Sequence, residues 1–141
     1  MKKLGIRNVL VTGGSGKIGS SALPQLVSAG YRIRAIQLPS EPVACPGVET
    51  MTGDLSDPTL APRAMRDMDA VIHLANVKEN RQTFMDMNVK GTFFLLDEAM
   101  RCGHIRQFIQ AGSDARSGIY YYPQPVPVTE ASPHRGYPGY Y

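Results

Sequence analysis

A glycine-rich turn is the first segment of the sequence whose residue types and spacing could do chemistry. Gly13, Gly16 and Gly19 stand three residues apart, directly after an apolar run and directly before an amphipathic stretch. Gly13 permits a tight turn, Gly16 lets the backbone approach a pyrophosphate, and Gly19 allows a helix to pack closely on a strand. Lys17 and Ile18 open the helix that follows, whose N-terminus supplies backbone donors and a positive dipole. The turn therefore predicts a phosphate-binding site.

The end of the second apolar run bears on which dinucleotide this turn would hold. An acid is usual about 20 residues after such glycines, where it accepts hydrogen bonds from the adenosine ribose. This chain has Gln37 there, which can bond a ribose hydroxyl but carries no charge to repel the 2′-phosphate of NADP. No arginine follows immediately to bind that phosphate, although Lys17 and Arg34 could favour one. The predicted cofactor is NAD or NADP, with the preference open.

Alternating apolar runs and amphipathic stretches predict the framework that positions these residues. Five runs bounded by turn signals indicate buried parallel strands at residues 8–12, 32–36, 48–51, 70–74 and 107–110. Helical spacing between them indicates helices at residues 17–29, 57–68 and 81–102, the second beginning at a Ser56 or Asp57 N-cap. The predicted fold class is α/β, a doubly wound parallel sheet of about five strands in the Rossmann-like order 3-2-1-4-5.

Composition sets the domain organisation and excludes several classes of function. The 141 residues, 43% of them hydrophobic, suffice for one domain with a real core. Residues 1–117 are predicted to form the dinucleotide-binding domain, and residues 118–141, with six of the seven tyrosines, an irregular Tyr/Pro-rich tail. A net charge of +3 argues for neither nucleic acid nor membrane binding. The sequence has neither a secretory signal nor a long apolar run, so the expected location is cytoplasmic. Its two cysteines lack metal-ligand spacing, so no metal site is predicted.

Four motifs together resemble the extended short-chain dehydrogenase/reductases, in particular the NAD-dependent epimerase/dehydratase group. They are residues 12–19, 53–55, 69–75 and 88–92. The resemblance implies that Asp54 bonds the adenine amino group and that the backbone of Leu55 supports the ring. It further implies that Leu74, Ala75 and Asn76 line the adenosine ribose and the pyrophosphate. Asn88 is interpreted either as a satisfied core amide or as an active-site neighbour.

Catalysis in this family belongs to a Ser or Thr, a Tyr and a Lys, in which the lysine lowers the tyrosine pKa. By resemblance, Ser113 is the candidate hydroxyl that orients the substrate oxygen. The approach to the family tyrosine, from Pro127 to Glu130, places that tyrosine at Tyr141 or at Tyr140. The motif is YxxxK, and the last lysine of this sequence is Lys90. We therefore expect a truncated approach to the motif and the N-terminal part of the family only.

Two functions follow from these features. The first is the NAD(P)-binding part of an epimerase/dehydratase-type oxidoreductase acting on a sugar nucleotide or a related sugar hydroxyl. Within it, residues 112–114 with Gly118 and residues 120–123 are similar to uronate dehydrogenases. The alternative is a catalytically incompetent dinucleotide-binding module or a truncated gene product, so whether this chain is itself an enzyme stays open. The expected partners are a dinucleotide, a sugar-like substrate and, in a homo-oligomer, a second copy.

Overall fold

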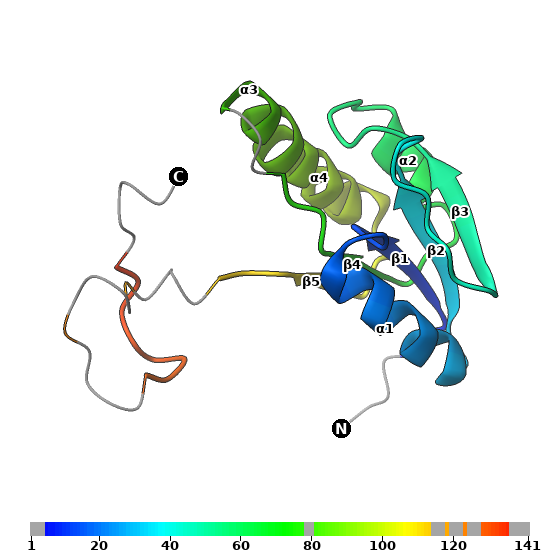
Figure 1. The fold of residues 1–141 in the computed structure, drawn as a ribbon, viewed down its shortest axis with the longest axis horizontal. Coiled ribbons are helices and arrows are strands. Elements are labelled where there is room, and N and C mark those ends of the chain that lie inside the picture. Colours follow the sequence, from blue (N-terminus) through cyan, green and yellow to red (C-terminus); the bar gives the residue numbers. More distant parts are fainter. Residues whose placement is uncertain (1–4, 78–80, 114–117, 119–122, 124–127, 136–141) are drawn as a thin grey trace. The chain divides into compact units, whose positions relative to one another are not determined.

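A computed structural model describes residues 5–77, 81–113, 118, 123 and 128–135, and the chain divides into two compact units, Met1–Gln110 and Ala111–Tyr141. The first unit is a parallel sheet with helices on both faces (Figure 1). Its strands are β1 (Asn8–Thr12), β2 (Arg32–Gln37), β3 (Val48–Thr52), β4 (Ala70–His73) and β5 (Gln107–Gln110). Its helices are α1 (Lys17–Ser28), α2 (Leu60–Ala64), α3 (Arg81–Thr83), the π-helical η1 (Phe84–Gly91) and α4 (Thr92–Cys102).

The order of the strands is β3-β2-β1-β4-β5 and all four pairings are parallel, which confirms the predicted fold class. β1 lies in the centre, with Leu10 opposite Arg34 on β2 and Val71 on β4. From β1 the chain proceeds to one edge through β2 and β3, and then returns to the other side of β1 through β4 and β5. The carboxyl end of β1 is therefore the switch point of the sheet, where open α/β sheets bind their ligands.

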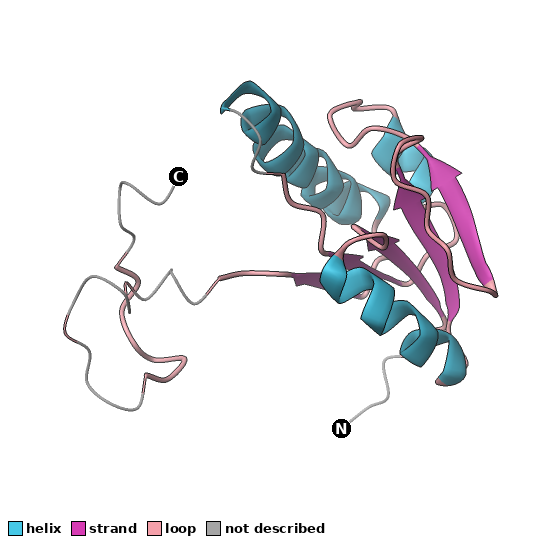
Figure 2. Ribbon diagram, in the orientation of Figure 1, coloured by secondary structure: helices cyan, strands magenta, loops and turns pink. Residues whose placement is uncertain are grey.

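The sheet lies between its helices (Figure 2), and a cluster of apolar side chains packs on each of its faces. Successive side chains of a strand point to opposite faces, and β1 divides its residues accordingly. Val9 and Val11 join Leu23 of α1 on one face, whereas Leu10 joins the residues of α2 and α4 on the other. The side chains of β1 are almost fully buried from Val9 to Thr12. Burial on both faces gives the strand that leads into the glycine turn a fixed position.

The second helix is shorter than the sequence predicts. Helix α2 covers Leu60–Ala64 instead of residues 57–68, so the predicted bounds were wrong at both ends. Asp57 Oδ1 accepts hydrogen bonds from the backbone and the hydroxyl of Thr59, both at 2.8 Å, and this side-chain turn precedes the helix instead of capping it. At the other end, Arg34 Nη1 donates to the carbonyls of Ala64 and Arg66, and the backbone turns into the left-handed region at Asp67, with φ +63°.

The third helical stretch has the predicted limits but not the predicted geometry. Helical structure runs from Arg81 to Cys102 as expected, but residues Phe84–Gly91 are π-helical. A π-helix has i→i+5 hydrogen bonds and occurs mostly as a short insertion within an α-helix, frequently at a functional site. Here Met87 lines the cleft described below, and the neighbouring Asn88 bonds the loop after β4. The prediction of a uniform α-helix was wrong over these eight residues.

In the second unit, the described residues include a turn at Thr129–Ser132. The backbone N–H of Ser132 donates to the carbonyl of Thr129, and the hydroxyl of Ser132 accepts from the N–H of Thr129, both at 3.0 Å. The turn closes on itself through the serine side chain. Over the described residues of both units, no helix is long and apolar enough to cross a membrane.

Candidate functional site

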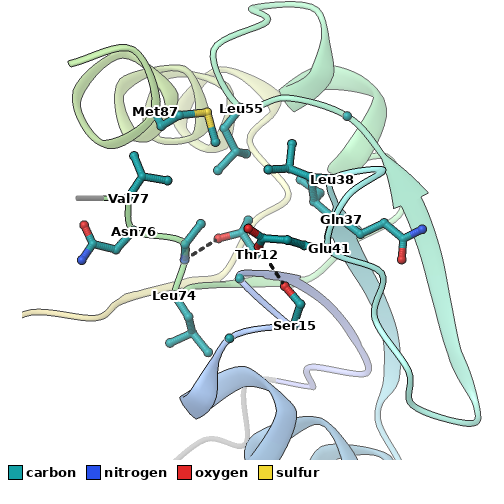
Figure 3. A pocket seen from close by; sticks show the side chains of 15 residues that line it. Thr12, Ser15, Gln37, Leu38, Glu41, Leu55, Leu74, Asn76, Val77 and Met87 are labelled. Carbon is teal, nitrogen blue, oxygen red and sulfur yellow. Dashed lines mark hydrogen bonds between the residues drawn. The ribbon is translucent and has the colours of Figure 1, made fainter. Parts of the chain in front are cut away.

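A cleft opens at the carboxyl edge of the sheet, where β1, β2, β3 and β4 end (Figure 3). The glycine turn after β1 forms one side of it, and the loop after β2 the opposite side. The segments after β3 and β4, together with η1, close it. Its lining comprises Thr12, Gly13, Ser15, Gly16, Ile36, Gln37, Leu38, Glu41, Gly53, Leu55, Leu74, Ala75, Asn76, Val77 and Met87. Five separate segments of the chain thus meet at the switch point of the sheet.

The glycines of the turn meet the requirements that their spacing suggests. A Cβ on Gly13 would lie 2.6 Å from the backbone nitrogen of Ala75, and one on Gly19 would lie 2.2 Å from the carbonyl oxygen of Gly13. Both positions therefore require glycine, because neighbouring backbone atoms leave no room for a side chain. Gly16 differs, because a Cβ there would meet only the Gly13 oxygen, at 3.3 Å, within 4 Å. The open space above Gly16 is where an anion could approach the backbone.

The N-terminus of α1 supplies the donors for such an anion. The first helical hydrogen bond runs from the N–H of Ser20 to the carbonyl of Gly16 at 2.8 Å. The N–H groups of Lys17, Ile18 and Gly19 precede it and have no partner within the helix. The first turn contains no acidic residue, and Gly16 provides no side-chain cap. The residues present therefore fit a pyrophosphate, which these donors and the helix dipole would hold.

An apolar wall faces the turn across the cleft. Leu38 from the loop after β2 and Leu55 from the segment after β3 lie on one side, and Val77 and Met87 lie beside them (Figure 3). Leu55 is 4% exposed. It is seated against Gly91, where a Cβ would come within 2.8 Å of the Leu55 Cβ. A polar turn on one side and an apolar wall on the other suit a ligand that joins a phosphate to a flat ring.

A buried polar network fixes the segment after β4. Thr12 Oγ1, fully buried, accepts a hydrogen bond from the N–H of Ala75 at 3.2 Å and lies 2.6 Å from His73 Nδ1. His73 Nε2 in turn lies 2.8 Å from Thr92 Oγ1 at the start of α4. The hydroxyls and the imidazole together join β1, β4 and α4. His73 therefore has a structural role, in which its two ring nitrogens bond the hydroxyls of Thr12 and Thr92.

Burial of His73 makes the network sensitive to acid. Desolvation lowers the pKa of the imidazole below its usual value of about 6.5. Between that value and the lower pKa of the folded state, the unfolded chain binds more protons, so stability falls as the pH falls through this window. We expect the urea midpoint of the wild type to decrease more steeply between pH 7.5 and pH 5.5 than that of His73→Gln. His104→Gln, at an exposed position, is the control, and equal slopes for wild type and His73→Gln would contradict the assignment.

Asn88 holds the next part of the same loop. Its Oδ1 accepts from the N–H of Val77 at 3.0 Å, while its Nδ2 donates to the carbonyl of Val77 at 2.8 Å and to Asn76 Oδ1 at 2.7 Å. Asn88 does not line the cleft, but both residues that it bonds do. In this structure it is a satisfied amide that positions the cleft wall.

Two further residues proposed from the sequence have their polar groups bonded within the protein. Gln37 lines the cleft, but its amide points away from it (Figure 3), where Oε1 accepts from the N–H of Val43 at 2.9 Å and Nε2 lies 3.4 Å from Thr52 Oγ1. Asp54 is exposed, and its Oδ1 accepts from the N–H of Ser56 at 2.8 Å. Its roles toward a cofactor, and those of Gln37, stay predictions.

The structure brings most of the predicted binding residues together. Seven of them line the cleft: Gly13, Gly16, Gln37, Leu55, Leu74, Ala75 and Asn76. Lys17, Ile18 and Gly19 form the first turn of α1, and Asp54 and Asn88 adjoin lining residues. Of the two catalytic candidates, Ser113 belongs to the second unit and Tyr141 lies outside the described residues.

Eight lining residues were not predicted from the sequence: Thr12, Ser15, Ile36, Leu38, Glu41, Gly53, Val77 and Met87. Most of them adjoin predicted ones and could have been found by extending each strand end by one or two positions. Glu41 has a different signal, a carboxylate within a few residues of the end of β2. It is the only charged residue among those that the structure places in the lining. No group of three His, Cys, Asp or Glu residues that could hold a metal occurs in the described parts of the chain.

The sheet order and the glycine turn at its switch point define a doubly wound domain of the Rossmann type. Residues 9–138 match the NAD dependent epimerase/dehydratase family, and the chain belongs to this family. UDP-glucose 4-epimerase of Lactobacillus helveticus is 33% identical over 137 residues, which cover 89% of this chain and 40% of that protein. A 3 beta-hydroxysteroid dehydrogenase/Delta 5→4-isomerase of Mycobacterium tuberculosis is 30% identical over 118 residues, 76% of this chain and 32% of that protein.

Solved structures show the same relationship. A short-chain dehydrogenase/reductase superfamily protein from Agrobacterium tumefaciens, solved with bound NAD, is 30% identical with a TM-score of 0.80, and the match covers 93% of this chain and 40% of that one. A mutated uronate dehydrogenase is 26% identical with a TM-score of 0.79, over 93% of this chain and 47% of that one. This chain thus spans less than half the length of these relatives.

Proposed function

We propose that this chain binds a nicotinamide dinucleotide in the cleft and forms the cofactor-binding part of an oxidoreductase. The observation that carries the proposal is the glycine turn at the switch point, with an open approach at Gly16 and three N–H groups of the first helical turn above it. The pyrophosphate would lie at the N-terminus of α1, and the adenine would lie against Leu38 and Leu55. Bound there, the cofactor supplies hydride-transfer chemistry.

We further propose a sugar nucleotide or a related sugar hydroxyl compound as the substrate. The likenesses to a UDP-glucose 4-epimerase and to a uronate dehydrogenase support this class. In this proposal Ser113 orients the substrate oxygen and Tyr141 exchanges its proton. The alternative is a dinucleotide-binding module without catalysis. The two are distinguished by mixing the protein and NAD or NADP with either substrate: net oxidation of a uronate gives the near-ultraviolet absorbance of the reduced cofactor, and epimerisation of a UDP-sugar, which consumes no net cofactor, gives the 4-epimer.

Replacement of Gly16 tests the cofactor site itself. We expect calorimetric titration of the wild type to show one dinucleotide site, and Gly16→Val to weaken binding at least about tenfold, because its side chain fills the approach to the backbone donors. Within the protein the new Cβ would meet only the Gly13 oxygen, at 3.3 Å, so the circular dichroism spectrum and the urea midpoint should change little. A Gly16→Val variant that binds as tightly as the wild type would place the phosphate elsewhere.

A further inference from the structure

Resting on the proposed function, we infer that the Glu41 carboxylate selects NAD against NADP. The position at the end of β2 where an acid usually binds the adenosine ribose holds Gln37. Its amide is turned away from the cleft and is bonded to Val43 and Thr52. A carboxylate nevertheless stands at this side of the cleft, supplied four residues later by the loop.

The loop after β2 holds Glu41 in a defined place. The N–H of Glu41 donates to the carbonyl of Leu38 at 3.1 Å, closing a tight turn, and the N–H of Val43 donates to Gln37 Oε1 at 2.9 Å. Pro39 and Pro42 fix two backbone dihedrals within this short stretch. The turn therefore limits the positions that the side chain can reach, although Glu41 itself is exposed.

The carboxylate is directed across the cleft toward the glycine turn. Ser15 Oγ donates to Glu41 Oε2 at 3.4 Å, which joins the loop after β2 to the phosphate-binding turn (Figure 3). The adenosine ribose connects the adenine to the pyrophosphate, so it must lie between the apolar wall at Leu38 and the N-terminus of α1. Glu41 and Ser15 are the polar side chains that face this path from the two sides.

The negative charge of Glu41 beside the ribose determines which of the two dinucleotides, NAD or NADP, binds more tightly. A carboxylate accepts hydrogen bonds from ribose hydroxyls, but it repels the additional 2′-phosphate of NADP. The cations that could offset this repulsion lie elsewhere. Arg34 donates to Glu49 and to the end of α2, and Lys17 is exposed on α1 and does not line the cleft. A phosphate beside Glu41 would therefore meet negative charge without a lining cation among the described residues.

The test compares the affinities for NAD and for NADP by calorimetric titration of the full chain. We expect the wild type to bind NAD about 10 to 100 times more tightly than NADP, and this ratio to decrease as salt screens the repulsion. Glu41→Gln should bring the two affinities within about threefold, mainly by tighter binding of NADP. Glu41→Arg should reverse the preference. Titration with AMP and with 2′,5′-ADP, which differ only in the 2′-phosphate, should give the same ratios, since these ligands carry only the adenosine half.

Asp97→Asn is the control, because it removes the same charge from an exposed carboxylate on α4, outside the cleft lining, and leaves the Arg34–Glu49 pair intact. It should leave the ratio unchanged. Equal affinities of the wild type for NAD and NADP would overturn this inference and leave the proposed function intact. A ratio that Glu41→Gln does not alter would also overturn it. If neither dinucleotide binds, the proposed function fails and the inference fails with it.

Discussion

Gly13→Ala should abolish dinucleotide binding and destabilise the domain by about 3 kcal/mol, because two costs coincide at this position. The backbone of Gly13 has φ +70°, a left-handed conformation that side chains disfavour. The new Cβ would also lie 2.6 Å from the nitrogen of Ala75 and 2.7 Å from the carbonyl carbon of Leu74. These are backbone atoms of the segment that lines the cleft, so the strain cannot be relieved by rotation of a side chain.

Gly103→Ala measures the cost of the left-handed backbone alone, without the cost of a close contact. Gly103 ends α4 with the same φ of +70°, but a Cβ at this position would have nothing within 4 Å. We expect this variant to lose only about 1 kcal/mol of unfolding free energy and to bind the dinucleotide like the wild type. Urea unfolding and calorimetric titration of both variants measure the difference. Equal destabilisation of the two would show that the contact with residues 74 and 75 carries no cost.

The framework of the sheet could be predicted from the sequence because its signals are local. The central strands β1, β2 and β4 are short apolar runs that are mostly buried, as predicted. The prediction of burial was wrong for β3 and β5, because they lie at the edges of the sheet and most of their residues are exposed. The spacing of the glycine turn is likewise visible within a few consecutive residues. Helix α1 ends at Ser28, within one residue of the predicted end, because Gly30, with φ +88°, follows the C-cap residue Ala29. Central strands buried on both faces leave few alternative registers, so the order of the strands followed once these elements were recognised.

The sequence did not predict those features of the structure that depend on contacts between distant segments of the chain. The carbonyls at the end of helix α2 are bound by Arg34, about 30 residues earlier in the chain, and do not continue the helix. Glu41 reaches the cleft through a bond to Ser15, which is 26 residues away. The π-helical turns of η1 accompany the hydrogen bonds from Asn88 to the loop after β4. None of these contacts has a periodicity that a single sequence reveals.

Thr12 shows the same principle at the centre of the site, since its role depends on two residues more than 60 positions away. Its hydroxyl accepts from the N–H of Ala75 and pairs with His73 Nδ1. Both bonds are made by an atom that water does not reach, because Thr12 is 0% exposed. Loss of the hydroxyl would leave the buried His73 Nδ1 without its partner and the half-buried N–H of Ala75 without its acceptor, and an unsatisfied buried group costs about 1–3 kcal/mol.

Thr12→Val should therefore destabilise the domain by about 2–3 kcal/mol, although it preserves the shape of the side chain. Thr12→Ser is the matched variant, because it keeps the hydroxyl and loses only a methyl group, at a cost of about 1 kcal/mol. Urea unfolding should rank the stabilities as wild type, Ser and then Val. Dinucleotide affinity should fall about tenfold in Thr12→Val alone, since its lost bond is the one that fixes Ala75 in the cleft wall. If Val were as stable as Ser, the hydroxyl would not be the group that holds β4 and its loop against β1.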